Sequence, residues 1–133
     1  MSAHAALAAA VAAALDGHAA LAEAVTGIFD APPVRAALPY ALVEEPVLAD
    51  WGTKDMAGRE GRIAVLLFDG GERPARLRVL AGAAEAAVEA MPRTLDDGWR
   101  VASLVLARSR ILPDGASRWV AMGEWRVRML KQG

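Results

Sequence analysis

The sequence predicts one α+β domain over residues 1–133, with a mixed or antiparallel sheet of about four strands and two main helices on one face. Three observations support this fold class. Two segments carry apolar residues at helical spacing, four segments have the composition or alternation of strands, and the order helix–strand–strand–helix–strand–strand is that of an α+β protein. The length is close to the commonest size of a single domain, and no linker or internal repeat divides it.

The first 25 residues predict a helix with one interruption. Leu7, Val11 and Leu21 fall on one helix face. Asp16 and Gly17 offer a helix stop and a cap for a second, short helix that begins near residue 18. The segment superficially resembles a signal peptide, but it lacks a basic n-region and carries polar residues throughout. Its apolar run is too short and too rich in alanine to cross a membrane, so we expect a soluble helix of an intracellular protein with no membrane partner.

Two strands are expected in the middle of the chain. The first covers residues 38–48, where Pro39 is tolerable at the start and Pro46 marks an edge or a bulge. The second covers residues 61–69 and reads GRIAVLLFD. Because its apolar residues follow one another without alternation, both of its faces are predicted to be covered and the strand to be central in the sheet.

The C-terminal half predicts a helix followed by a hairpin. The helix is expected at residues 72–91, with Pro74 in its first turn. Strands at residues 99–112 and 117–130 follow, joined by a Pro-Asp-Gly turn. The last strand alternates between an apolar side and a side rich in arginine. The residues expected in the core are Trp99, Val101, Val105, Trp119, Trp125 and Val127, beneath Leu77, Leu80, Ala84 and Val88.

The composition excludes several classes of function. The chain has no cysteine, which rules out disulfides, zinc–thiolate sites, iron–sulfur clusters and thiol nucleophiles. It has 15 basic and 16 acidic residues, a formal net charge of −1. This balance is not that of a protein whose main work is gripping phosphate backbones.

The polar residues do not predict a catalytic or metal site. His4 and His18 lie fourteen positions apart on the predicted helix, and no carboxylate shares their spacing, so they are interpreted as surface or core-edge histidines. Glu44 and Glu45 are adjacent on a predicted strand and would point to opposite sides. The serines of the C-terminal strands have no histidine near them in the sequence. No catalytic residue, cofactor or metal ligand is therefore expected.

The segment at residues 51–61, WGTKDMAGREG, suggests either a phosphate-binding loop or an arm for protein contacts. A phosphate-binding loop of this kind leads from a strand into the N-terminus of a helix, whereas this segment leads into a strand. Asp55 and Glu60 would also repel a phosphate. Trp51 stands beside a polar, charged segment, a composition typical of a protein–protein anchor. A solvated loop with no partner is the remaining alternative.

The order and spacing of four segments, between about residues 5 and 129, carry a family resemblance. The segments are AALDGHAALAEAVTGIFD, PPVRAALPYALVEE, DWGTKDMAGREGRIAVLLFD and GWRVASLVLARSRILPDGASRWVAMGEWRV. Together they resemble the tail-completion, or tail-terminator, family of long-tailed phages, prophages and phage-like gene transfer agents. The resemblance implies a homohexameric ring at the head-proximal end of the tail tube. That ring would stop tube polymerisation, contact the major tail tube protein and the head–tail connector or stopper, and let DNA pass without sequence-specific binding.

The resemblance also suggests where partners bind. It places the protein in the neck or tail of a virion or phage-like particle, assembled in the bacterial cytoplasm. The arm is expected to be mobile until a neighbour orders it, because of Gly52, Gly58 and Gly61. The arginines of the last hairpin suit bidentate pairing across interfaces, although lining the DNA path is a competing use. The candidate interface residues are Trp51, Lys54, Asp55, Met56, Arg59, Glu60, Arg108, Arg110, Arg118, Glu124, Arg126 and Arg128.

Two alternative functions remain open from the sequence. The first is a head-side joining protein of the neck, which would belong to the same kind of particle. The second is a small-molecule-binding α+β domain, for which the sequence offers no convergent set of polar residues.

Overall fold

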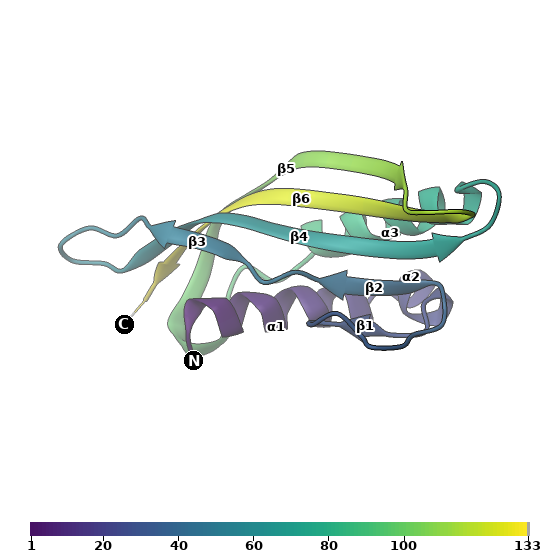
Figure 1. Cartoon of the computed structure of the whole chain (residues 1–133). Coiled ribbons are helices and arrows are strands. Elements are labelled where there is room, and N and C mark those ends of the chain that lie inside the picture. Colours follow the sequence, from purple (N-terminus) through teal and green to yellow (C-terminus); the bar gives the residue numbers. More distant parts are fainter. Residues whose placement is uncertain (133) are drawn as a thin grey trace.

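The computed structural model describes residues 1–132, which form three α-helices and a mixed sheet of six strands. The helices lie together on one face of the sheet (Figure 1). This confirms the α+β class, with two more strands than expected. The elements in chain order are α1 (Ala3–Asp16), α2 (Ala19–Ala24), β1 (Ile28–Phe29), β2 (Tyr40–Val43), β3 (Val47–Asp50), β4 (Gly58–Gly70), α3 (Ala75–Glu89), the 3-10 turn η1 (Asp96–Gly98), β5 (Trp99–Pro113) and β6 (Arg118–Lys131).

The strands run in the spatial order β1-β2-β4-β6-β5, and β3 pairs with the first part of β4. The β1–β2 pair is parallel and the other pairs are antiparallel. The strand expected at residues 38–48 is thus two strands, β2 and β3. Pro46 explains the break, because it lacks an N–H for the ladder and restricts the backbone of the residue before it.

The helix α1 begins where Ser2 accepts a hydrogen bond from the Ala5 amide at 3.1 Å, and it ends at Asp16. The interruption before α2 is therefore confirmed. The expected cap by Asp16 is not formed, because His18 occupies the cap position of α2 and its side chain makes no capping hydrogen bond. Within residues 1–132, no helix is long and apolar enough to span a membrane.

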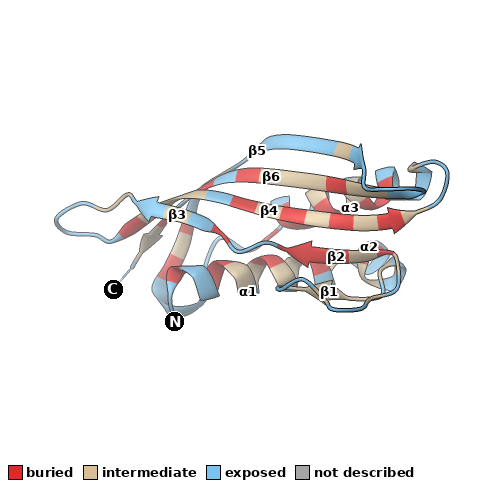
Figure 2. Ribbon diagram, in the orientation of Figure 1, coloured by how far each residue is buried: buried red, intermediate tan, exposed pale blue. Residues whose placement is uncertain are grey.

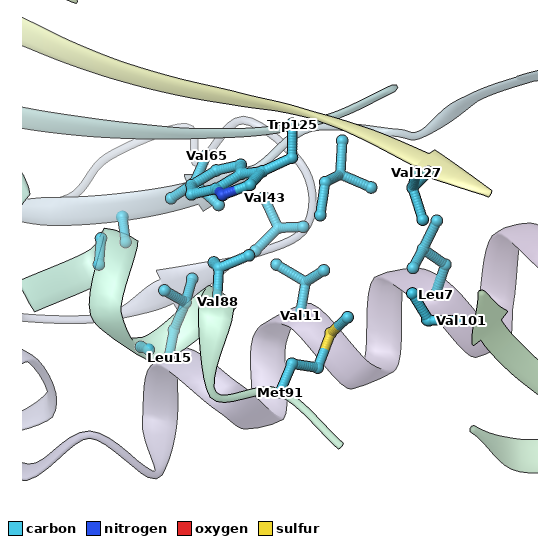
Figure 3. Close-up of a cluster of buried hydrophobic side chains, with 14 of the residues drawn as sticks. Leu7, Val11, Leu15, Val43, Val65, Val88, Met91, Val101, Trp125 and Val127 are labelled. Carbon is cyan, nitrogen blue, oxygen red and sulfur yellow. The ribbon is translucent and has the colours of Figure 1, made fainter. Parts of the chain in front are cut away.

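The core lies between the helices and the sheet and centres on Trp125, which is fully buried. Val11 of α1, Val88 of α3 and Val65 of β4 lie around its indole (Figure 3). Gly123 lies close to the same ring, since a Cβ there would stand 2.7 Å from a ring carbon of Trp125. The expected core is confirmed for Trp99, Val101, Trp125 and Val127, which are buried, and for Trp119, which is half-buried against the core, beneath Leu77, Leu80, Ala84 and Val88.

Val105 is the exception to the expected core. The register of β5 against β6 shifts between Val101 and Ser103 and again between Leu106 and Arg108. Each shift is a β-bulge, and one extra residue moves the following side chains to the other face of the sheet. Val105 therefore lies opposite Arg126 on the face that the helices do not cover, and it is 49% exposed.

Candidate protein interface

The strands β3 and β4 form a hairpin that projects beyond the helices (Figure 1). We call residues 47–62 the arm. Its turn is closed by hydrogen bonds from the Trp51 amide to the Gly58 carbonyl (3.0 Å) and from the Thr53 amide to the Met56 carbonyl (2.8 Å). The end of β6 adds another, from the Lys131 amide to the Ala57 carbonyl at 2.9 Å. The sequence analysis treated residues 51–61 as a loop, whereas the structure makes them part of a β-hairpin with paired backbone groups.

The three glycines of the arm allow its strands to approach closely. A Cβ at Gly52 would stand 2.9 Å from the Met56 carbonyl oxygen, and one at Gly58 would stand 2.8 Å from that of Trp51. A Cβ at Gly61 would overlap the carbonyl group of Val47 in β3. These glycines were interpreted as a source of mobility. The structure gives these glycines a further role, because a side chain at any of the three positions would push the hairpin apart.

The tip of the arm carries an apolar surface. Trp51 is half-buried, Met56 is 39% exposed, and both line a hollow of about 720 Å³ together with Leu130 of β6. The guanidinium of Arg128 lies 5.1 Å from the centre of the Trp51 ring, close enough for a cation–π contact. It also donates to the Glu60 carboxylate at 3.2 Å. Arg128 thereby links Trp51, beside the apolar hollow, to Glu60 of β4.

The remaining candidates in the arm are dispersed. Lys54 and Asp55 are exposed at the turn and form no ion pair with the described residues 1–132. Arg59 points toward the helical side, where its guanidinium lies 5.8 Å from the Trp99 ring centre and donates to the Gly58 carbonyl at 2.8 Å. Arg59 thus contributes to the base of the arm rather than to its tip.

The second candidate surface is the face of the sheet that the helices leave uncovered, which we call the open face. The register of β4, β5 and β6 brings seven of the expected residues to it. As the sequence predicted, the apolar side chains of β6 lie on one face of the sheet and its arginines on the other. The seven residues are Glu60, Arg108, Arg110, Arg118, Glu124, Arg126 and Arg128.

Arg62 belongs to the open face and was missed by the sequence analysis. It lies opposite Arg126, and its guanidinium contacts one Glu124 oxygen at 3.2 Å. Arg108 contacts the other Glu124 oxygen at 3.8 Å, and the Glu124 side chain is only 14% exposed between them. The position of Arg62, two residues after Glu60 on a strand, could have identified it, because alternate residues share one face.

Arg126 stands at the centre of the basic part of the open face. It lies beside Arg62 and Arg128 in a groove of about 550 Å³, which Glu60 and Val105 also line. Like charges facing each other across strands are destabilising. Arg126 forms no ion pair within residues 1–132, and the same holds for Arg110 and Arg118.

The other part of the open face is apolar. Tyr40 stacks on Phe68 at 4.9 Å between ring centres and meets Phe29 edge-on at 5.8 Å. Leu66 and Phe68 of β4 are half-buried on this face, whereas their neighbours on the helical face are buried, as the alternating colours of β4 show (Figure 2). The prediction that β4 is central in the sheet is confirmed. Among the described residues 1–132, however, a second layer covers only one of its faces.

The other polar residues singled out in the sequence form no cluster with the spacing of a metal site. Across residues 1–132, no three histidine or acidic side chains are placed to hold a metal ion together. His4 lies 3.6 Å from Glu45, and His18 precedes α2. Glu44 and Glu45 lie between β2 and β3 rather than on a strand.

Two comparisons show which known proteins the chain is similar to. The model of the family described as tail completion protein gp17 matches residues 9–129. Among solved structures, a chain of the virion of a native gene transfer agent particle is similar, with 27% sequence identity and a TM-score of 0.73, covering 98% of this chain and 99% of that one. No match was found among curated proteins.

Proposed function

The chain belongs to the tail completion protein gp17 family, and we propose that it is a tail terminator. It is a structural component of a phage or phage-like particle. The proposed assembly is a homohexameric ring at the head-proximal end of the tail tube. This ring stops polymerisation of the tube, joins the tail to the head–tail connector, and lets DNA pass through its central hole.

The observation that carries the proposal is the position of the arm within the matched region. A family match over residues 9–129 includes the whole arm, all of β5 and all but the last two residues of β6. Because the arm is already paired, it presents Trp51 and Met56 without first losing backbone entropy. A preformed apolar tip next to charged residues has the composition of an interface core with its polar rim. The proposed partner of the tip is a neighbouring subunit or the tube protein below.

The arginines of the open face are proposed to contact neighbouring subunits. Arg110, Arg118 and Arg126 are exposed and have no acidic partner within residues 1–132. A carboxylate from a second copy can pair with a guanidinium in two parallel hydrogen bonds. Lining the DNA path is the competing role of these arginines. Reversing the charge of one arginine distinguishes the two roles, because they differ in their effect on ring formation.

We propose no catalytic role and no cofactor for this chain. Structural virion proteins use their binding energy for assembly, and none of the polar residues described above pairs a nucleophile with a base.

The experiment that tests the proposal is native mass spectrometry of the pure protein, followed by negative-stain imaging with tail tubes. Hexamers that cap one end of each tube are expected. A protein that stays monomeric and leaves tube length unchanged would contradict the proposal. Binding to the head connector without binding to tubes would assign the chain to the head side of the neck instead.

A further inference from the structure

We infer that in the ring the open face of one copy packs against the helical layer of the next copy, with a basic surface meeting an acidic one. The inference rests on the proposed ring and names the two surfaces that form its repeated contact. The helical layer is defined here as α1, α2, α3 and η1, and it lies on the side of the sheet opposite the open face (Figure 1).

The apolar side chains on the open face need a cover. An apolar strand without alternation is typical of a sheet with layers on both sides. In β4, Ala64, Leu66 and Phe68 point to the open face and remain half-exposed, next to the stacked ring of Tyr40. A contiguous apolar patch rimmed by polar residues is typical of an interaction site rather than of a solvated surface.

Basic and acidic residues are segregated between the two sides of the sheet. The register of β4, β5 and β6 assigns seven of the chain's 15 basic residues to the open face and only two of its 16 acidic residues, Glu60 and Glu124. Arg100 shares this face by register but is half-buried. The seven basic residues are Arg62, Arg100, Arg108, Arg110, Arg118, Arg126 and Arg128. The net charge of −1 therefore conceals a strongly basic surface on an otherwise acidic protein.

The helical layer has the opposite charge. Its only basic residues are Arg76 and Arg78, and Arg76 is already paired with the buried Asp69. Its acidic residues outnumber them threefold, and the exposed ones without an ion pair within residues 1–132 include Asp16, Glu23 and Glu89. The acidic residues are Asp16, Glu23, Glu85, Glu89, Asp96 and Asp97.

This arrangement decides between two ways of covering the open face. If two open faces met around a two-fold axis, arginine would face arginine, and like charges brought together at an interface are costly. If the open face meets the helical layer, the guanidiniums face a surface rich in carboxylates. The two surfaces lie on opposite sides of the body, so every copy uses both of them. Such a head-to-tail contact builds a closed ring when the rotation between copies is suitable.

The outer side of α1 is compatible with close approach of a sheet. From residue 5 to residue 15 this helix carries no charged side chain, and its exposed positions Ala5, Ala9 and Ala13 are alanines. The short alanine side chains of α1 allow a neighbouring layer to pack closely against the helix. The carboxylates of the helical layer lie at the helix ends and do not obstruct this contact.

A charge-exchange experiment tests the inference. The first variant is R110E/R126E, on the open face, where neither arginine has an ion pair within residues 1–132 to lose. The second is D16K/E89K, at the last residues of α1 and α3. A basic side chain is favourable at a helix C-terminus, so this variant should fold. The control is R35E, an exposed residue outside both surfaces.

Native mass spectrometry should show hexamers for the parent and R35E, and monomers for R110E/R126E and for D16K/E89K alone. An equimolar mixture of the two variants should restore hexamers with three copies of each, because every contact then joins opposite charges. Thermal melting of each monomer separates loss of assembly from loss of folding.

Other outcomes overturn the inference in distinguishable ways. If R110E/R126E still forms hexamers, the open face is not a subunit contact and is free to line the DNA path. If the mixture stays monomeric, the helical layer is not the partner surface. If it stops at dimers of one copy of each variant, the open faces meet each other. If the parent itself forms no hexamer, the proposed ring fails, and this result is independent of the variants.

Discussion

The Nε and Nη2 atoms of Arg76 donate to the two carboxylate oxygens of Asp69 at 2.8 and 2.6 Å, which ties the first turn of α3 to the end of β4. Asp69 is buried, and its carboxylate also accepts from the Gly70 amide at 2.8 Å. A buried charge is stable only when it is paired and hydrogen-bonded. This pair therefore fixes how the helical layer sits on the sheet.

The first prediction is a dependence of stability on pH. The hydrogen bonds from Arg76 lower the pKa of the Asp69 carboxyl, and burial opposes them only in part. A carboxyl with a lowered pKa stabilises the fold above the ordinary pKa of about 3.9, and this stabilisation is lost as the pH falls below that value. Urea unfolding of the parent should show a loss of stability as the pH falls below about 4 that is smaller in D69N. D69N should also be less stable at pH 7 by about 1–3 kcal/mol. Equal acid sensitivity in both proteins would contradict this role.

The second prediction concerns the centre of the core. Trp125 is fully buried, so Trp125→Ala should lower the free energy of unfolding by about 3–5 kcal/mol, because it leaves a cavity. Val105→Ala is the matched control on the neighbouring strand. Since Val105 lies on the open face, its truncation should change the stability of the monomer by less than about 0.5 kcal/mol. If the two variants melted alike, the assignment of the two faces would be wrong.

The contrast between Trp125 and Val105 shows what alternation can and cannot predict. The last strand, β6, contains no bulge of its own. Apolar and polar residues that alternate in its sequence therefore lie on opposite faces of the sheet. The two bulges of β5 cannot be recognised in the sequence, because the extra residue at each of them is an exposed alanine. Alternation counted from Trp99 and Val101 therefore assigned Val105 to the wrong face.

The arm shows a second limit of the sequence. Glycines near charged residues predict a flexible loop when the strand that they approach is not known. The pairing of β3 with β4 decides that Gly61 lies against the Val47 carbonyl, and no local pattern reveals this contact. In the same way, the resemblance predicted the arm and the arginines as contacts. The sequence did not show that these arginines and Arg62 share one basic face. Their common face follows from the register of three strands.

The third prediction uses two glycines in opposite surroundings. A Cβ at Gly123 would stand 2.7 Å from a ring carbon of Trp125, so Gly123→Ala should force the indole or the strand to move and destabilise the protein by about 1–3 kcal/mol. Gly82 lies within α3, is exposed, and has no atom within 4 Å of the position of its Cβ. Gly82→Ala should therefore stabilise the protein by about 0.5–1 kcal/mol. Chemical denaturation should show that Gly123→Ala lowers the free energy of unfolding and that Gly82→Ala raises it. A change in the same direction for both variants would contradict the packing described here.

The fourth prediction concerns the pairing of the arm. Gly61→Ala should displace β3, because a Cβ there overlaps the Val47 carbonyl, while the core around Trp125 stays intact. The expected result is faster hydrogen exchange at the amides of residues 47–50, with a smaller change in the melting temperature than in Trp125→Ala. The same variant should cap tubes less well if an ordered arm is needed. Unchanged exchange at residues 47–50 would show that the strand pair tolerates the methyl group.

The last prediction separates the tip of the arm from its fold. Trp51 and Met56 line the hollow beside Leu130, and neither is among the fully buried core residues. Replacing both with serine removes the apolar contact surface and leaves the backbone hydrogen bonds of the turn in place. The melting temperature of the monomer should change little, because the tip contributes little to the core. Ring formation or tube capping should weaken, giving tails of uncontrolled length, since a few buried aromatic and apolar residues carry most of the affinity of an interface.

A matched control is Lys54→Ser with Asp55→Ser, at the exposed turn between the two apolar residues. This variant keeps the apolar tip and removes one charge of each sign, so its effect on capping should be small and should depend on salt. If the control impaired capping as much as the Trp51 and Met56 variant, the charges of the turn rather than its apolar residues would hold the partner. If neither variant changed tail length, the arm would be a solvated connection without a partner.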